Sequence, residues 1–323
     1  MIRLPKTLKV VALCLGMLAG VAQAQGYPNR PVKIVVPFAA GGPADNYARF
    51  MAQRLGEELK QSFVIDNKPG AGSIIGTDLV AKAPADGYTL LMMSNTHTVN
   101  ESLIPTKPFG LMKDFVGIAP VNYSNLLLVV HPSVPAKTVG ELIALAKAKP
   151  GKINYASSGN GTPYHMAGEL FKYMAGIDMT HVPYKGSSGA RTDIVGGQVD
   201  VMFDAETTMA VMSREGKVRA LANTGLTRSA NLPDMPTVSE SGVPKYEATI
   251  WLGLMAPKGT PAEIVNRLNA EVRKIVNSTE VKATWAKQGA VPMSMTVPEF
   301  DQYLHADIAK WANIVKVSGA KPD

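Results

Sequence analysis

The sequence contains almost no cysteine. Cys14 is the one cysteine among 323 residues, and it lies inside an apolar run, Val10–Val21, that follows three basic residues. The run ends in Ala-Gln-Ala at 22–24, so we interpret residues 1–24 as a secretory signal peptide cleaved after Ala24. The exported chain then has no thiol, which excludes disulfides, thiolate metal sites and cysteine nucleophiles.

Long hydrophobic runs are also missing after the signal peptide. The run at Val10–Val21 is too short to span a bilayer stably, and no later segment is as hydrophobic without interruption. Lipid attachment at Cys14 is the alternative to cleavage after Ala24. Leu13 argues against it, because small residues are expected just before a lipidated cysteine. We therefore expect a soluble protein exported to the periplasm.

Neither charge nor aromatic residues are concentrated in this chain. There are 33 Lys and Arg against 26 Asp and Glu, a net charge of +7. Because three of the basic residues belong to the signal peptide, the exported chain has only a mild positive surplus. Such a surplus is not the footprint of a nucleic-acid-binding protein. Aromatic residues make up 7% of the chain, which argues against a sugar site lined by aromatic rings.

Motifs of nucleotide binding and of catalysis are absent. The glycines at 70, 72 and 76 are spaced G-x-G-x-x-x-G, which is not the dinucleotide fingerprint, and no phosphate-binding P-loop motif occurs. The segment GSSG at 186–189 lacks the spacing of a serine nucleophile elbow. The five histidines (97, 131, 165, 181 and 305) are scattered without metal-ligand spacing. We expect no catalytic residue, no metal and no cofactor.

Strand and helix patterns alternate along most of the chain. Predicted strands lie at 32–38, 62–67, 88–94, 126–131, 153–158 and 248–257. Helices are predicted from Pro43 onward and at 73–82, 139–149, 261–277, 279–288 and 297–317. This alternation predicts an α/β fold with mixed, mostly parallel sheets flanked by helices.

The order of these elements indicates two domains. We expect residues 25–122 plus 248–323 to form a discontinuous domain 1, and residues 123–247 to form domain 2. The chain would cross between them near 120–126 and 243–249. A ligand cleft is expected between the domains, because sites in α/β proteins lie at the carboxyl ends of the strands.

Four loops share one design, a strand followed by small residues and a helix start. They lie at 37–45, 67–76, 156–165 and 183–191. Glycine lets the backbone turn at positive φ and lets a ligand approach the main chain. The helix that follows offers free N–H groups and a partial positive charge. Four such loops, two in each domain, predict a cleft lined with backbone donors that suits carboxylates.

Polar side chains near these loops have both a structural and a ligand-binding interpretation. Asp45 lies in the first turn of a helix, where a carboxylate interacts favourably with the helix dipole. Asp204 ends a strand, where it would orient loop amides or accept a hydrogen bond from a ligand. His165 fits a local bond at a helix start better than a ligand contact, and His97 fits either role.

Three aromatic residues flank the loops. Phe38, Tyr164 and Tyr184 either pack against neighbouring elements or form a wall for the carbon skeleton of a ligand. The sequence leaves both interpretations open.

Together these segments resemble one family, the solute receptors of tripartite tricarboxylate transporters, known as Bug or TctC proteins. The blocks occur in family order over essentially the whole exported chain: PFAAGGPADNYAR, NKPGAGSIIG, PADGYTL, YASSGNGTPYHMAGELF, HVPYKGSSGARTDIVGGQVD, LPDMPTVSESG and LMAPKGTPAEIVNRLNAEV. The resemblance implies a type II-like periplasmic binding protein of two domains that closes on a small mono-, di- or tricarboxylate. It further implies a monomer that delivers this acid to membrane permease subunits.

The resemblance also implies how the acid is held. In this family main-chain amides, hydroxyls and bridging waters hold the carboxylate, rather than an arginine clamp. By match to the family pattern, the expected contacts are Phe38, Ala40, Gly41, Asp45, Gly72, Ser73, Ser94, Thr96, Ser157, Gly159, Thr162, Tyr184 and Asp204. The chain departs from the pattern at Pro43-Ala44 and at Ser73-Ile74, which bears on ligand size and hydration.

Two other functions compete with transport. The ligand-bound form of such a receptor could signal through a membrane sensor kinase instead of a permease. An enzyme of organic-acid metabolism is the third class, and the absence of a nucleophile–base or metal constellation argues against it.

Overall fold

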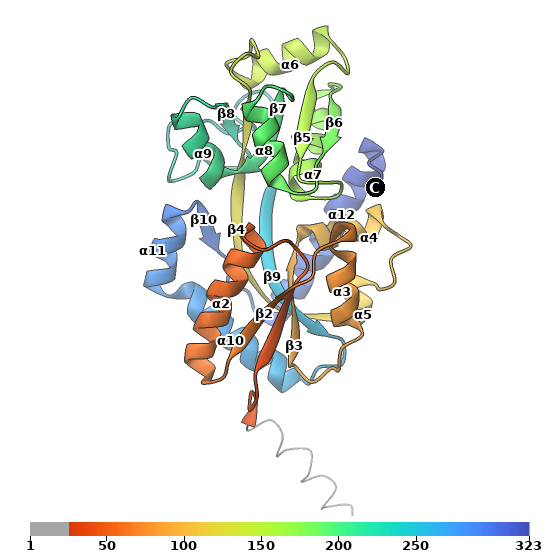
Figure 1. The fold of residues 1–323 in the computed structure, drawn as a ribbon, viewed down its shortest axis with the longest axis vertical. Helices are drawn as coiled ribbons and strands as arrows, with labels where there is room; N and C mark the ends of the chain where they lie inside the picture. Colours follow the sequence, from red (N-terminus) through yellow and green to blue (C-terminus); the bar gives the residue numbers. More distant parts are fainter. Residues whose placement is uncertain (1–25, 323) are drawn as a thin grey trace, which may run out of the picture.

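One long strand, β4 (Phe115–Val130), joins two sheets in this computed structural model, which describes residues 26–322. Residues 115–125 of β4 pair with β9 (Thr249–Pro257) in the sheet we call sheet A. Residues 126–130, all buried, pair with β7 (Val201–Ala205) and β8 (Arg219–Asn223) in sheet B. The sheets therefore meet within a single strand, and β9 runs beside it (Figure 1).

Sheet A is built from short apolar strands in the order β2-β1-β3-β9-β4, with β10 added on β4. The further strands are β1 (Val32–Val36), β2 (Phe63–Asn67), β3 (Thr89–Ser94) and β10 (Ala290–Pro292). Its flanking helices are α2 (Pro43–Leu59), α3 (Ile74–Ala81), α10 (Ala262–Asn277) and α11 (Thr279–Lys287). Helix α2 has an apolar stripe, in which Met51, Leu55 and Leu59 are all buried in the core of this sheet.

Sheet B has the same construction. Its remaining strands are β5 (Asn154–Ser157) and β6 (Thr180–Pro183). The helices beside it are α6 (Val139–Ala148), α7 (Pro163–Ala175), α8 (Ser187–Val195) and α9 (Glu206–Arg214). Three short elements, η2 (Ala71–Ser73), α4 (Asn95–Leu103) and α5 (Leu111–Asp114), complete the chain with the terminal helix α12 (Val297–Ser318).

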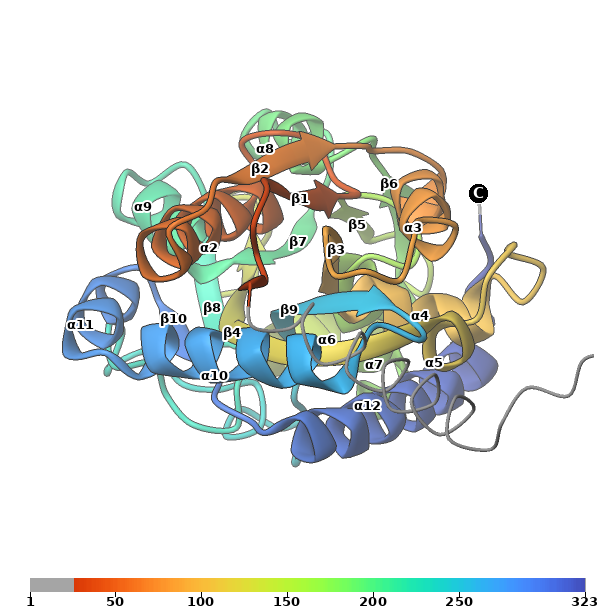
Figure 2. The same ribbon diagram turned by 90° about the horizontal axis from the view of Figure 1, so that it is seen from below.

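The hydrophobic core of sheet B extends beyond its own elements. Val99 and Leu103 of α4 and Trp311 and Ile314 of α12 belong to the same buried cluster as Phe171 of α7. Helices α10 and α12 lie along β4, and α12 also contacts α4 and α7 (Figure 2). On this side the elements of the two sheets are packed together.

The α/β fold and most of the predicted elements are confirmed, with one correction. Four strand pairings are parallel and five are antiparallel among the described strands, so the sheets are mixed but not mostly parallel. The reason is that β4 and β9 run antiparallel to each other and to every other strand with which they pair. The parallel pairs are confined to strands linked through a helix.

The sequence patterns missed several elements of the fold, of which β4 and α4 matter most for the site. The sequence predicted only 126–131 of β4, because residues 115–125 lack the regular alternation of a strand. It also predicted no helix at 95–103, since Asn95, Thr96 and His97 are polar although all three are buried. Val99 and Leu103 are the two apolar residues of this short helix, too few for a helical period to be recognised.

The division into domains stays a prediction, although the sheets bear on it. Pairing changes from sheet A to sheet B between Asn125 and Leu126, and β9 begins at Thr249. The predicted signal peptide and Cys14 lie outside the described residues. Within residues 26–322, no helix combines the length and the apolar character needed to cross a membrane.

Candidate functional site

A cavity of about 740 Å³ lies between the loops of the two sheets. Three of the four glycine-rich loops line it, through residues 38–44, residues 158 and 162–164, and residues 185–188 and 191. The loop at 67–76 contributes none of the lining residues. Residues of β9, α9 and α11 complete the wall, so both sheets contribute to the site.

Five helices begin at this cavity. The first residues of α2, α4, α7, α8 and α9, or the residues that cap them, belong to its lining: Gly42 and Pro43, Ser94 and Thr96, Thr162 and Pro163, Gly186 and Ser187, Ala205 and Thr207. The first N–H groups of a helix have no partner within the helix, and the helix dipole places a partial positive charge there. Their convergence makes the cavity a site for an anion.

The charged side chains of the lining are both cationic. Lys185 and Arg191 line the cavity, and no Asp or Glu does among the described residues. Arg191 forms an ion pair with Asp204 behind the wall, with Nε–Oδ2 at 2.5 Å and Nη2–Oδ1 at 3.0 Å. Burial raises the pKa of Asp204, while its hydrogen bonds from Arg191 act in the opposite direction. Arg191 is thus a partly neutralised cation, and Lys185 is an exposed one.

Asp45 holds the loop before α2 in place. Its Oδ2 accepts hydrogen bonds from the Gly41 backbone N–H (2.9 Å) and from Arg49 Nε (3.0 Å). Asn67 Nδ2 donates to Asp45 Oδ1 (3.0 Å) and to the Phe38 carbonyl (3.2 Å). Burial works against ionisation, but the hydrogen bonds from Arg49, Gly41 and Asn67 lower the pKa of Asp45 overall. Asp45 is a buried carboxylate that shapes the loop and does not line the cavity.

The loop before α7 is closed by its own hydroxyl groups. Thr162 Oγ1 donates to the Gly159 carbonyl (2.7 Å) and caps α7 by accepting from the His165 N–H (3.4 Å). Ser157 Oγ accepts from the Gly159 N–H (3.1 Å) and lies 2.6 Å from His181 Nε2. Gly159 itself has φ 127, a conformation that favours glycine. Thr162 lines the cavity, whereas Ser157 and Gly159 support the loop.

A buried polar network lies behind this loop. His165 stacks on His181 with ring centroids 4.0 Å apart, and Glu169 accepts from Tyr155 OH (2.5 Å) and Lys172 Nζ (2.9 Å). Burial lowers the pKa of His165 to about 4 and that of His181 to about 3. Both imidazoles are neutral at neutral pH, so the network supports the fold and adds no charge to the cavity.

The start of α4 holds one buried hydroxyl that has no partner among the described residues, and this hydroxyl belongs to a residue of the cavity lining. Ser94 and His97 form a capping box, in which Ser94 Oγ accepts from the Thr96 N–H (3.2 Å) and His97 Nδ1 accepts from the Ser94 N–H (3.1 Å). Burial lowers the pKa of His97 to about 4. Thr96 Oγ1 is buried and has no hydrogen-bond partner among the described residues. Thr96 also belongs to the cavity lining, so this buried, unpaired hydroxyl is a candidate donor to a ligand that reaches the start of α4.

The residues predicted as contacts fall into three groups. The first group lines the cavity: Phe38, Ala40, Gly41, Ser94, Thr96 and Thr162. The second group lies behind the lining and holds its loops or neighbouring helices: Asp45, Ser157, Gly159, Tyr184 and Asp204. The third group, Gly72 and Ser73, lies at the start of α3, where the Gly72 carbonyl accepts from Asn100 Nδ2 (2.8 Å). Direct contact with a ligand stays a prediction for all of them.

Sequence reasoning missed part of the wall. Ser187 and Ser188 were inside a recognised loop, and their position at a helix start was a usable signal. Tyr47, Phe50 and Trp285 also line the cavity. Nothing local marks Trp285, because α11 reaches the cavity only through the packing of distant segments.

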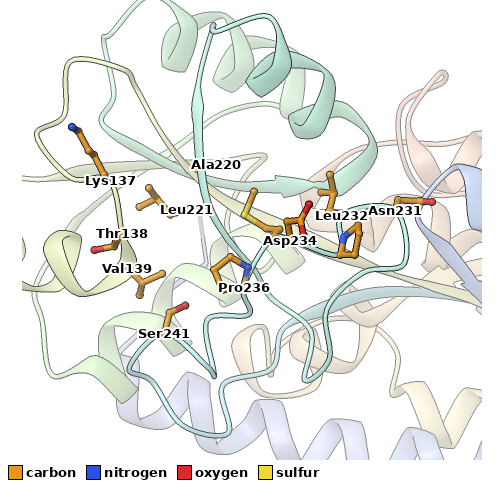
Figure 3. A pocket seen from close by; sticks show the side chains of 12 residues that line it. Lys137, Thr138, Val139, Ala220, Leu221, Asn231, Leu232, Asp234, Pro236 and Ser241 are labelled. Atoms are coloured by element: carbon orange, nitrogen blue, oxygen red, sulfur yellow. The ribbon is translucent and has the colours of Figure 1, made fainter.

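A second pocket of about 510 Å³ lies on the outer part of sheet B (Figure 3). It is formed by the start of α6 and the segment 231–236, and its charged lining residues are Lys137 and Asp234. The glycine-rich loops take no part in it. Its mixed charge, and a lining that includes no residue of the glycine-rich loops, favour the first cavity as the functional site.

A family model, curated proteins and solved structures all match this chain over most of its length. A family model described as the tripartite tricarboxylate transporter family receptor matches residues 47–320. Protein BugT of Bordetella pertussis is 38% identical, with 99% of each chain covered. The structure of R. palustris Rpa4515 with adipate has a TM-score of 0.86 and 36% identity, and covers 92% of this chain and 100% of its own. MatC of Rhodopseudomonas palustris with bound malate has a TM-score of 0.81 and 32% identity, covering 90% and 100%.

Proposed function

The chain belongs to the tripartite tricarboxylate transporter receptor family, and from this we propose that it captures a small organic carboxylate in the cavity between its two sheets. The observation that carries the proposal is the convergence of five helix starts on a cavity whose charged lining is cationic. Two relatives of similar structure hold the dicarboxylates adipate and malate, which agrees with this chemistry.

The proposed mode of binding follows from the donors on the wall. Backbone N–H groups at the starts of α2, α7 and α8 would donate to the carboxylate oxygens, and the Thr96 hydroxyl would add one more bond. Hydrogen bonds from preorganised donors to an ionised group are stronger than neutral ones, and no donor has to be recruited from solvent. Lys185 adds long-range attraction for an anion approaching the cavity.

Binding would be coupled to closure of the two halves. The pivot we propose is the pair β4 and β9, near the point where β4 changes from sheet A to sheet B. Packing of α12 against α4 and α7 fixes one side, so the halves would close on the opposite side, where α2 and α11 face α8 and α9. Such closure is the hinge motion of binding proteins.

Delivery to membrane permease subunits, as a monomer in the periplasm, completes the proposal. Family membership supports it, since the family is one of transporter receptors. Signalling through a sensor kinase is the alternative use of the same ligand-bound form. Genes for two membrane subunits beside this one would favour transport, and a sensor pair would favour signalling.

The test is a thermal-shift and calorimetric screen of purified exported protein. Mono-, di- and tricarboxylates form the test set, and neutral sugars and amines form the control set. A ligand that binds the folded state raises the melting temperature. We expect at least one acid to do so and to be recovered unchanged, because the proposed receptor catalyses no reaction. Stabilisation by a sugar or an amine and by no acid would exclude the proposal.

A further inference from the structure

The cavity has two walls of different chemistry. The side formed by sheet B carries hydroxyl groups and both cations, Lys185 and Arg191. The opposite side carries five apolar or aromatic side chains, which we call the apolar lobe: Tyr47, Phe50, Ile250, Leu252 and Trp285. They come from α2, β9 and α11, three elements that are far apart in sequence.

The apolar lobe is a fixed surface. The Trp285 ring meets Tyr47 at 5.2 Å between centroids and 83° between planes, and it meets Phe50 at 5.3 Å and 61°. These are edge-to-face geometries, which aromatic rings favour. Trp285 and Leu252 are buried, while Tyr47, Phe50 and Ile250 are half-buried and carry most of the accessible apolar surface. A wall built this way stays in place when the cavity is empty.

The lobe offers no partner to a second charge. The other polar residues that α2 and α11 contribute to the lining are Asn46, Thr284 and Gln288, the residue that caps the end of α11. All three are neutral. A ligand carboxylate placed against Tyr47 and Phe50 would lose water without gaining an ion pair, which is costly. An apolar group placed there would instead be removed from water at a gain of about 25 cal/mol per Å². The cavity volume of about 740 Å³ leaves room for such a group.

We infer that the preferred ligand is a carboxylate with one anionic head and an apolar body of the size of an aromatic ring. The head lies at the helix starts, and the body lies in the apolar lobe. This inference rests on the proposed function and narrows it, since a short dicarboxylate or tricarboxylate would leave the lobe unused.

The test first compares two acids that differ in the body alone, propanoate and phenylpropanoate, each of which carries one carboxylate. Malate and citrate are added as short acids that carry more than one carboxylate. Dissociation constants are measured by calorimetry on the exported protein. Burying the phenyl ring should make phenylpropanoate bind roughly thirtyfold more tightly than propanoate.

Variants locate the effect in the lobe. Phe50→Ala should weaken phenylpropanoate binding about tenfold and should weaken propanoate binding much less, because propanoate has no ring to place in the lobe. Phe63→Ala is the matched control, because Phe63 is also a half-buried phenylalanine packed against the same core, and it does not line the cavity. Ile250→Thr, which keeps a β-branched side chain in β9, is the second variant if Phe50→Ala does not fold.

The outcomes separate the inference about the apolar body of the ligand from the proposed function as a carboxylate receptor. If malate or citrate binds more tightly than phenylpropanoate, or if Phe50→Ala and Ile250→Thr leave phenylpropanoate binding intact, the apolar body is excluded while the carboxylate receptor stands. If no acid of either kind binds, the proposed function itself fails. The inference is supported if Phe50→Ala or Ile250→Thr weakens phenylpropanoate binding selectively and Phe63→Ala leaves phenylpropanoate binding unchanged.

Discussion

Arg191 reaches the cavity wall while its guanidinium is held from behind by the fully buried carboxylate of Asp204. The two groups form paired hydrogen bonds, so the arginine cannot swing freely to clamp a ligand. The pair links α8 to the end of β7, and it sets how much positive charge the cavity presents.

Replacing Asp204 tests this relationship. Asp204→Asn should destabilise the protein by about 3 kcal/mol, because it breaks a buried ion pair and leaves Arg191 without its counter-charge. Carboxylate affinity should be retained or increased, since the cavity becomes more positive. Urea denaturation and calorimetry measure the two quantities. Lost affinity in a folded Asp204→Asn variant would show that Asp204 itself supports ligand binding.

Thr96 and Thr77 give a matched pair of valine substitutions. Thr96→Val should leave the stability of the ligand-free protein unchanged, because its buried hydroxyl has no partner, and should weaken carboxylate binding about tenfold. Thr77→Val should cost about 1 kcal/mol of stability, because that hydroxyl bonds the Ser73 carbonyl and His97. Equal affinities for Thr96→Val and the wild type would remove this hydroxyl from the site.

Thr162 has a structural role as well as a place on the wall. Thr162→Val should lower the stability of the ligand-free protein by about 1 kcal/mol, because it removes the N-cap of α7. It should also weaken carboxylate binding through the altered loop. Thr162→Ser keeps the capping hydroxyl and is the control. If Thr162→Val binds as tightly as Thr162→Ser, the loop before α7 makes no contribution to affinity.

Stability should fall as the pH drops below 6.5. Burial lowers the pKa of His97 from 6.5 to about 4, so the unfolded chain binds a proton at higher pH than the folded one does. The stabilisation is therefore complete above pH 6.5 and is lost progressively down to about pH 4, by about 3 kcal/mol for His97 alone. His165 and His181 act in the same direction.

Denaturation curves at a series of pH values measure this dependence. His97→Gln should flatten the profile between pH 6.5 and 4, and His305→Gln, a change on the exposed side of α12, should leave it as it is. An identical profile for wild type and His97→Gln would mean that His97 titrates normally in the folded protein.

Much of the fold was predictable, because local patterns carry it. The strand at Val32–Val36 is β-branched and apolar, and α10 and α12 begin and end close to the predicted positions. The failures have a common cause. The α4 helix is mostly polar, with Val99 and Leu103 as its two apolar residues, yet the neighbouring helix α12 and the loop before α7 bury it. Its helical state depends on its surroundings and not on its own periodicity.

The sequence by itself determined the alternation of strands and helices and the glycine-rich helix starts, since both follow from contacts between near neighbours in the chain. Only the tertiary structure decided which of those loops share a cavity. It brought the loops at 38–44, 158–164 and 185–191 together and left 67–76 outside. It also placed Trp285 beside Tyr47 and Asp204 behind Arg191, because such pairs depend on the path of β4 and β9 between the sheets, which no local pattern encodes.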